Sequence, residues 1–568
     1  MNSKLTEEPA GVFAKDRLVH IGLIVLVYLL ATWFTNPWLM GDTVDYADSI
    51  FAYHSGYHLK FWEFGHLLWR PFGWLMFRVF NPLTSLIFGA DDRAKITFTL
   101  LAINWIGGLA CLLVLRALTE RVCNRQWIVT LAPIALLFSS AFLNYGQTGS
   151  AYAPGLALIL TGGLLLVKDN ERPGSKRLTI AAALLFAAGI ALWIPMVLIV
   201  PAVAALPFFL GAWNRRTFRS VIVTLVLAGV FIGIAYVAVV LNLGLTNLHD
   251  LREWVTEASH GMNRMRGIPR MVFGFANSLL DLGGQGAFFK RYLKSDPFNP
   301  VTLANLIWSS LWKLAFAYVF LLVVFINLLR SRRGRMIATL VILNVVPTII
   351  FALFIFEAGD MSRYIATLPL IFLAVAYSLC SEKSIGWTRY VILGFLAVSI
   401  ITNVSAMATP KLQQREQKVE ARVSPLLPLL KPESRVVTSH LQDDINNFTR
   451  DFLFNPVNRS GNLHYYPMVA PNTAHVDNWQ QTFAVEVLRI WNNNGDIWVS
   501  KRMLSPRPKA EWNWVEGDDP RVSWTDLYNF FTPFQWGAEV GGEDGFILLQ
   551  PSPQNREILN RLAQQPKL

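Results

Sequence analysis

The sequence predicts a mainly α-helical, polytopic membrane protein with a bundle of about 11 transmembrane helices and a C-terminal external α/β domain. Hydrophobic residues make up 53% of the 568-residue chain and charged residues only 15%, whereas soluble domains carry about 25% charged residues. Nearly all of the long apolar runs lie in the first 406 residues. These observations exclude a soluble globular protein and a disordered chain, and three cysteines exclude a disulfide-stapled secreted module.

Eleven apolar runs approach the roughly 20 residues that a helix needs to cross a bilayer. They lie near 18–36, 96–117, 127–144, 150–167, 177–193, 195–212, 219–243, 304–329, 336–356, 364–381 and 387–406. Between the fifth and sixth runs, Trp193 and Pro195 favour a tight turn over one long helix, because proline restricts the residue before it.

The net charge of +12 reflects membrane topology and indicates no nucleic-acid partner. Residues 407–568 hold 17 Lys+Arg and 18 Asp+Glu, so 33 basic and 20 acidic residues remain in the first 406. The basic residues gather in alternate short loops, at 116–125, 168–177, 215–219, 330–335 and 383–389. The positive-inside rule makes these loops cytoplasmic. The N-terminus is then inside, as an uncleaved signal anchor, and the C-terminal region is outside.

Two domains are expected from this topology. Residues 1–406 form a transmembrane domain with long external loops at 37–95 and 244–303, and residues 407–568 form an external soluble domain. This second domain has candidate strands at 435–439, 497–500 and 545–549 and many tryptophans. The tryptophans suit either glycan stacking or ordinary core packing, and core packing is the simpler interpretation.

Three carboxylates directly follow the first predicted span. Asp42, Asp45 and Asp48 stand within seven residues at the outer membrane boundary. In a helix, Asp45 and Asp48 would share a face, with Asp42 at the helix start. Intramembrane or boundary charges often mark function, but an acidic helix cap with solvated neighbours is the alternative.

The segment from Asp42 to Tyr46, Ala47 and Asp48 resembles the acidic motif in the first external loop of GT-C membrane glycosyltransferases. The nearest parallels are lipid A aminoarabinose transferases and protein O-mannosyltransferases. The multiple spans, the long external loops and the external C-terminal domain are all expected of this class. The resemblance implies a GT-C type bundle for residues 1–406 and, from the class, a bacterial inner (plasma) membrane location with a periplasmic or extracellular C-terminal domain.

In that family the leading aspartate is the proposed catalytic base. The resemblance therefore assigns the base to Asp42, with Asp45 as the competing choice. The sequence departs from the closest relatives because Thr43, and not a second acid, follows Asp42. Ser362, Arg363 and Tyr364 with Pro369 are similar to an Arg-Tyr-x-x-x-x-Pro element found in many of these enzymes.

The resemblance implies transfer of one sugar from a polyprenyl-phosphate donor to a glycan, lipid or protein acceptor on the outer membrane face. An inverting displacement needs a base for the acceptor proton and positive charge where the phosphate leaves. Arg363 is the leading phosphate binder because it is the lone cation in a short external loop; its alternative role is an ion pair with Glu357 or Asp360. Further candidates are Arg266, Arg270, Lys290 and Arg291, which otherwise form solvated or headgroup-binding charge.

The remaining candidates for substrate binding are Tyr46, His66, Arg70 and Tyr364. No cofactor is expected. A divalent metal held by His54, His58 or His66 with Asp42 or Asp45 is a weaker alternative, since neither HExxH nor CxxC spacing occurs. Membrane lipids are expected neighbours.

Two other functions, transport and scaffolding, would depend on different features of such a chain. A transporter or lipid flippase would place polar or broken helices at the membrane midplane, often with repeat symmetry. Here the ionisable residues cluster at the outer boundary and the two halves do not repeat. A scaffold that recruits partners through the C-terminal domain would leave the acidic loop without a role.

Overall fold

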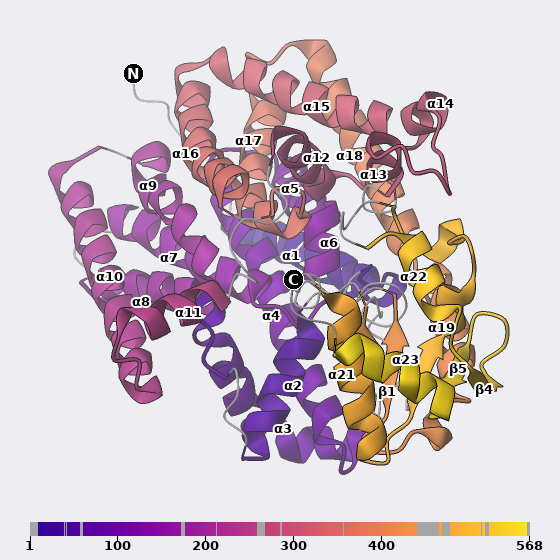
Figure 1. Ribbon diagram of the computed structural model, residues 1–568. Coiled ribbons are helices and arrows are strands. Elements are labelled where there is room, and N and C mark those ends of the chain that lie inside the picture. The colour runs from indigo at the N-terminus through magenta and orange to yellow at the C-terminus, as the bar shows by residue number, and fades with distance from the viewer. Residues whose placement is uncertain are drawn as a thin grey trace. The chain divides into compact units, whose positions relative to one another are not determined.

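The computed structural model describes most of the chain. The described residues are 10–38, 40, 42–56, 61–171, 176–211, 213–257, 267–283, 287–355, 357–439, 465–468, 478–512, 514–516 and 522–564. They divide into two compact units (Figure 1). The first comprises Met1–Pro37, Asp42–Leu282 and Lys313–Ala408, and the second comprises Trp38–Gly41, Gly283–Trp312 and Thr409–Leu568. Part of the predicted second external loop therefore belongs to the second unit.

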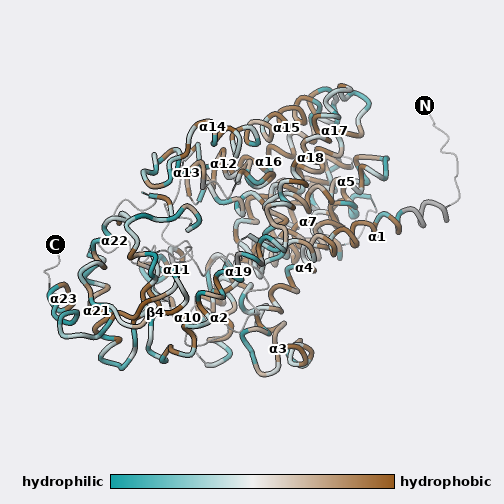
Figure 2. The backbone as a smooth tube through the Cα atoms, turned by 90° about the vertical axis from the view of Figure 1, so that its right-hand side faces the viewer, coloured by the Kyte–Doolittle hydropathy of each residue, from teal (hydrophilic) through white to brown (hydrophobic). Residues whose placement is uncertain are grey.

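The first unit is built from helices. They are α1 (Ala10–Phe34), α2 (Thr43–His54), α3 (Trp69–Phe88), α4 (Asp92–Thr119), α5 (Gln126–Leu137), α6 (Ser140–Tyr145), α7 (Tyr152–Glu171), α8 (Lys176–Leu192), α9 (Val200–Leu210), α10 (Arg215–Leu243), α11 (Leu248–Glu257), α12 (Ile268–Leu279), α15 (Trp312–Leu329), α16 (Arg332–Phe354), α17 (Leu368–Cys380) and α18 (Gly386–Met407). Short 3₁₀ helices η1 (Phe64–His66), η2 (Ile194–Leu198) and η5 (Met361–Thr367) connect them. Figure 2 shows hydrophobic residues along the long helices.

Among the described residues, eight helices are long and apolar enough to cross a membrane. They are Arg17–Phe34, Asp92–Thr119, Tyr152–Glu171, Arg215–Leu243, Leu303–Leu329, Arg332–Phe354, Met361–Cys380 and Gly386–Met407. α1 and α10 expose most of their apolar side chains, as lipid-facing helices do. The chain is an integral membrane protein.

The other three predicted spans contain shorter helices. The run at 127–144 is divided into α5 and α6 by extended backbone at Ser139. The run at 177–193 forms the 17-residue α8. The run at 195–212 forms η2 and then α9, after an extended Trp193 and with Pro195 near the start of η2. The positions predicted for these spans are therefore right, but their helices fall short of a full crossing by length.

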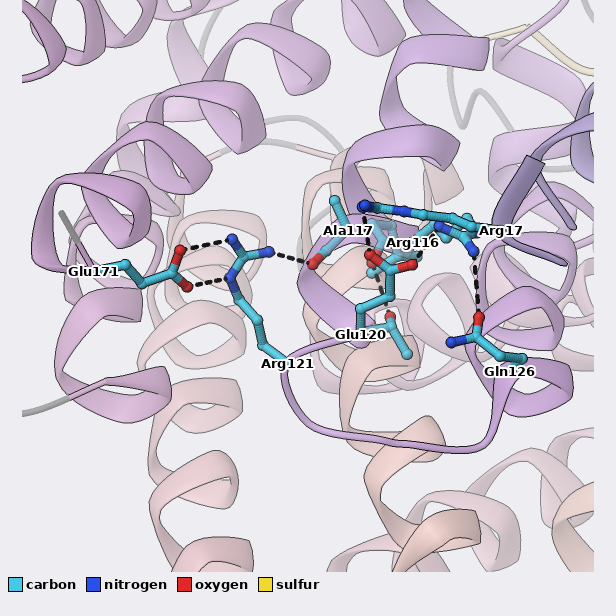
Figure 3. Close-up of polar contacts among 9 residues, drawn as sticks. Arg17, Arg116, Ala117, Glu120, Arg121, Gln126 and Glu171 are labelled. Carbon is cyan, nitrogen blue, oxygen red and sulfur yellow. Dashed lines mark hydrogen bonds and ion pairs between the residues drawn. The ribbon is translucent and has the colours of Figure 1, made fainter. Parts of the chain in front are cut away.

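One end of the first unit is held together by arginine and glutamate side chains (Figure 3). Glu120 accepts from Arg17 at 2.8 Å and from Arg116 at 2.5 Å. Arg121 contacts Glu171 with both Nε and Nη2, at 2.8 and 3.2 Å. These contacts join the start of α1, the end of α4 and the end of α7, which all lie in loops predicted to be cytoplasmic. If successive spans cross the membrane in opposite directions, these three helix ends must lie at the same membrane face.

The opposite end gathers the segments predicted to be external. The Thr43 hydroxyl accepts from the backbone N–H of Gly149 at 2.9 Å, and Asn36 N donates to the Met407 carbonyl at 2.9 Å. The Asn403 side chain donates to the Phe138 carbonyl at 2.7 Å. The ends of the first, third and last predicted spans therefore lie at one face, as alternate crossing predicts.

The second unit contains a mixed five-stranded sheet in the order β2-β1-β3-β5-β4. The strands are β1 (Arg435–Thr438), β2 (Tyr465–Pro467), β3 (Ile497–Ser500), β4 (Trp536–Val540) and β5 (Phe546–Leu549). β1 is parallel to β2 and β3, whereas β5 is antiparallel to β3 and β4. The three strands predicted from sequence are confirmed as β1, β3 and β5.

Helices accompany this sheet within the second unit. They are α13 (Ala287–Leu293), α14 (Leu303–Leu306), α19 (Thr409–Val423), α21 (Trp479–Asn492), α22 (Trp524–Phe531) and α23 (Pro553–Ala563). Trp491, Trp512 and Trp524 are buried in one hydrophobic core with strands β3 and β5. Core packing therefore accounts for these tryptophans.

We expect Glu120→Ala to destabilise the first unit strongly. The side chain of Arg116 is only 2% exposed, so removing its carboxylate partner leaves a buried guanidinium unpaired, at a cost of about 3 kcal/mol. The apparent melting temperature of the purified protein in detergent measures this loss. Arg17→Ala is the matched control, because Arg17 is 57% exposed and an exposed pair contributes about 0–1 kcal/mol. Equal melting temperatures for the two variants would contradict the prediction.

Candidate functional site

The site begins where α2 follows the first transmembrane helix. Asp42 occupies the cap position of α2, yet its side chain makes no capping hydrogen bond. One turn later, the buried Tyr46 directs its hydroxyl to Asp42 Oδ2 at 3.3 Å. The capping alternative therefore does not describe this carboxylate, which instead lies beside a buried phenol.

The other two acids of the motif have different surroundings. Asp48 forms a two-point ion pair with Arg93 at 2.6 and 2.8 Å, which ties α2 to α4. Asp45 lies on the exposed side of α2. Of the two competing bases, Asp42 is the one that the structure places next to Tyr46 and His66.

His66 continues the polar chain from Asp42 and Tyr46. Its Nδ1 lies 3.0 Å from the Leu192 carbonyl, and its Nε2 lies 3.0 Å from the Tyr46 hydroxyl. A carbonyl only accepts, so Nδ1 carries the proton of the neutral ring. Burial lowers the pKa of His66, although the nearby Glu63 and Asp42 charges act in the opposite direction. Neutral His66 thus accepts from Tyr46 at Nε2.

Tyr46 has one hydroxyl proton and two acceptors. Burial is the main reason that the pKa of Tyr46 is raised well above its usual range, with the Asp42 charge adding to the effect. The phenol therefore stays protonated and donates to either His66 or Asp42. While His66 is neutral, the shorter contact at 3.0 Å favours donation to His66, which leaves the Asp42 carboxylate available to another donor.

Arg70 completes this side of the site. It lies in the first turn of α3, with its Cζ 4.9 Å from the centre of the Tyr46 ring. Its guanidinium is buried and pairs with Glu63. A cation over an aromatic face is favourable, so Arg70 fixes the orientation of Tyr46 as well as carrying charge. His66 of η1 and Arg70 of α3 therefore both contact Tyr46.

Two tyrosines extend the site toward the Arg363 loop. The Tyr152 ring lies 6.3 Å from His66 and 5.2 Å from Tyr145, between ring centres. The Tyr145 hydroxyl donates to Asp360 Oδ1 at 3.3 Å. The charges of both Asp42 and Arg363 act on the Tyr152 hydroxyl. Tyr145 and Tyr152 therefore connect the acid of the first external loop with the late external loop.

Arg363 is held by both of the acids named as its alternative partners. Its Nη2 lies 2.6 Å from Glu357 Oε2 and 3.7 Å from Asp360 Oδ2. Asp360 also accepts from the backbone and hydroxyl of Ser362, at 2.8 and 2.6 Å, which starts η5. Glu357 has φ 45°, a left-handed conformation that is uncommon outside glycine. The guanidinium is thus fixed in place before any ligand arrives.

The remaining predicted site residues are distributed differently. Tyr364 is buried and donates to the Ala358 carbonyl at 2.7 Å, so it shapes the loop. Arg270 is exposed on α12, and a methyl group added at Gly359 would lie 3.8 Å from its Cβ, so this predicted cation is beside the Arg363 loop. Arg266 lies outside the described residues.

Lys290 and Arg291 belong to α13 in the second unit. Arg291 is buried and donates to the carbonyls of Ala510 and Trp514, at 2.8 and 3.4 Å. These bonds occupy its guanidinium with packing inside that unit. Lys290 is exposed on the same helix.

The described residues contain no group of three His, Cys, Asp or Glu side chains arranged to hold a metal ion. His54 lies 3.8 Å from Asp92 and packs edge-on against Phe77, and His58 lies outside the described part of the chain. His54 is therefore joined to α4 rather than to the Asp42 carboxylate.

Sequence reasoning missed Tyr145 and Tyr152. Tyr145 lies within, and Tyr152 just after, the short segment 144–150 between the third and fourth predicted spans, which contains no Lys or Arg. Two tyrosines beside a short loop without charged residues are weak evidence for a functional site. Their contacts depend on four separate spans ending at the same face, which a local motif does not encode.

This arrangement supplies a carboxylate and a fixed guanidinium along one aromatic wall. A carboxylate can accept a proton, and a guanidinium can bind negative charge. Because the connecting rings of Tyr145 and Tyr152 are buried, both charged groups act in surroundings of low polarity, where electrostatic effects are stronger than in water.

No family model and no curated protein sequence matches the chain. Solved structures that resemble it include ArnT from Cupriavidus metallidurans bound to undecaprenyl phosphate, with 11% identity and TM-score 0.47, covering 86% of this chain and 93% of that one. The oligosaccharyltransferase of Archaeoglobus fulgidus in complex with zinc and sulfate has 12% identity and TM-score 0.45, covering 92% and 72%. The same enzyme tethered to an acceptor peptide has 12% identity and TM-score 0.44, covering 94% and 74%. Both are GT-C superfamily enzymes, the class that the first external loop resembles. At these scores the likeness carries no argument about chemistry, which depends on the contacts described above.

Proposed function

We propose that the protein is a membrane glycosyltransferase that moves one sugar from a polyprenyl-phosphate donor to a hydroxyl-bearing glycan, lipid or protein acceptor at the outer membrane face. The observation that carries the proposal is the Asp42 carboxylate, which makes no cap, contacts a buried phenol and shares an aromatic wall with Arg363.

Asp42 acts as the base in this proposal. The acceptor oxygen bonds to the anomeric carbon as its proton passes to Asp42, and the bond from that carbon to the phosphate oxygen breaks. A single displacement of this kind inverts the anomeric configuration. Tyr46 positions the carboxylate, and neutral His66 holds the Tyr46 hydroxyl so that Asp42 is free to accept the incoming proton.

Arg363 stabilises the charge that develops on the departing lipid phosphate. A fixed cation acts more effectively than one that must reorient during the reaction, and Glu357 and Asp360 keep this guanidinium in place. Arginine also matches phosphate oxygens with two parallel donors. Arg270, beside the same loop, is the second cation available to the phosphate.

Asp42→Asn is expected to lower the rate of sugar transfer by at least about 100-fold, because the isosteric amide accepts no proton and general bases typically contribute this much. Purified enzyme with a radiolabelled polyprenyl-phosphate sugar measures the transfer. The matched control is Asp45→Asn on the exposed side of α2, which we expect to retain activity. Undiminished transfer by Asp42→Asn, or selective loss in Asp45→Asn, would move the base elsewhere.

The pH dependence of transfer should report on His66. Burial holds the pKa of His66 below its ordinary value, which is about 6.5, so the ring is neutral at pH 7 and gains a proton only in more acidic solution. Protonated Nε2 then donates to Tyr46, and Tyr46 turns its own proton to Asp42, which makes the carboxylate a weaker base. We therefore expect kcat/KM to decrease in acidic solution, at pH values below the ordinary pKa of histidine.

In His66→Gln this acid limb should be lost, because the amide that replaces the imidazole gains no proton in acidic solution. Tyr46→Phe should remove the same limb, since the phenol carries the effect from His66 to Asp42. An acid limb that is the same in all three proteins would show that His66 does not control the base.

A further inference from the structure

A cavity of about 300 Å³ lies at the end of the first unit opposite to Asp42. It is formed where the last turn of α7, the end of α9 and the first turn of α10 come together, and these helices are neighbours in Figure 1. On α7 the cavity is lined by Asp169 and Asn170. These residues directly precede Glu171, which belongs to the network of Figure 3. The proposed glycosyl transfer makes no use of this cavity.

A buried carboxylate lines one side of the cavity. Asp169 is only 7% exposed, and its Oδ2 accepts from the Ser220 hydroxyl at 2.9 Å. Ser220 is in turn 2.9 Å from the Thr179 hydroxyl. Within the described part of the chain, no Lys or Arg forms an ion pair with Asp169. A buried carboxylate is costly without a cation, so this wall suits a positively charged ligand group.

The other side of the cavity suits negative charge. Arg216 lines it from the first turn of the 29-residue helix α10. Asn214 caps this helix by accepting from the Thr217 N–H at 2.7 Å. The backbone N–H groups at a helix start and an arginine side chain both bind phosphate oxygens. Arg216 lies beyond ion-pair distance of Asp169 in the described contacts, so the two charges do not neutralise each other directly.

The outer surface of α10 provides room for lipid chains. Phe218, Ile222 and Val226 are exposed along this helix, starting next to Thr217 of the cavity wall. α10 is also one of the helices whose apolar window is least buried. A headgroup in the cavity therefore has a hydrophobic surface beside it.

We propose that this cavity binds a phosphoethanolamine group, with the primary ammonium on Asp169 and the phosphate on Arg216 and the start of α10. The occupant is the headgroup of a membrane phosphatidylethanolamine. A simple anion would meet the Asp169 carboxylate, and a simple cation would meet Arg216. A ligand that carries an ammonium and a phosphate a few ångströms apart can pair with Asp169 and Arg216 at the same time. This site is independent of the glycosyl-transfer proposal.

Lipid binding to the full-length protein in detergent tests this assignment. The probes are dioleoyl phosphatidylethanolamine, dioleoyl phosphatidylglycerol, which lacks the ammonium, and free phosphoethanolamine, with dissociation constants from native mass spectrometry. We expect wild type to bind phosphatidylethanolamine about tenfold more tightly than phosphatidylglycerol, since one charge-assisted hydrogen bond contributes about this factor.

Asp169→Asn should abolish this preference, and Arg216→Gln should weaken both lipids. Arg219→Gln is the matched control, because Arg219 is exposed on the same helix one turn beyond Arg216 and does not line the cavity; it should leave both affinities unchanged. Arg216 is itself exposed, so its variant tests the site even where the buried Asp169 variant folds poorly.

Free phosphoethanolamine distinguishes binding of the free headgroup from binding of the intact phospholipid. Its competition with the lipid would show that the headgroup alone is the ligand, whereas lipid binding without competition would assign the site to the intact phospholipid. Equal wild-type affinity for the two lipids, or a preference that survives in Asp169→Asn, would overturn the proposal.

Discussion

The structure depends on the requirement that backbone polar groups in lipid be satisfied within the chain. This requirement makes each crossing a helix, and each helix carries the chain to the opposite face. Segments hundreds of residues apart are thereby delivered to one boundary. For this reason Asp42 and Arg363 both lie close enough to Tyr152 for their charges to act on its hydroxyl. The basic loops around Arg121 lie together at the other boundary.

Where helices end inside the first unit, buried asparagines satisfy the carbonyls that the helices leave unpaired. Asn104 of α4 donates to the carbonyls of Tyr145 and Thr148, both at 2.6 Å. Asn403 of α18 donates to Phe138 at 2.7 Å and to Leu279 at 3.0 Å. These amides allow the third predicted span to break into α5 and α6, and that break places Tyr145 beside Asp360. The polar site is thus supported by the same hydrogen bonds that make interrupted helices tolerable in a membrane.

The sequence was informative wherever a property belonged to a single segment. Bilayer thickness fixes the length of an apolar run, so the helices appeared near their predicted positions, and short apolar runs in the C-terminal region coincide with β1, β3 and β5. Interrupted helices were harder to foresee, because the break at Ser139 depends on Asn403 from another helix. The Asp42 motif was recognisable because its acids are adjacent in the chain. Tyr145 and Tyr152 were not recognisable, since only packing brings them to Asp42 and Arg363.

The charge of an arginine and its position in a predicted external loop do not by themselves identify a phosphate-binding residue. Arg291 has the charge and the loop position expected of a phosphate binder, yet two backbone carbonyls and the buried Asp296 carboxylate occupy it. Arg363 is paired with the partly exposed carboxylates of Glu357 and Asp360 in the described contacts. A phosphate competes with those carboxylates for the same guanidinium donors, whereas no anion replaces the buried carbonyl contacts of Arg291 without disrupting the packing of that unit. The difference between the two arginines is therefore in what a ligand must displace. In the proposed function, a phosphate at Arg363 would exchange one anion for another, so binding would leave the local charge balance close to where it began.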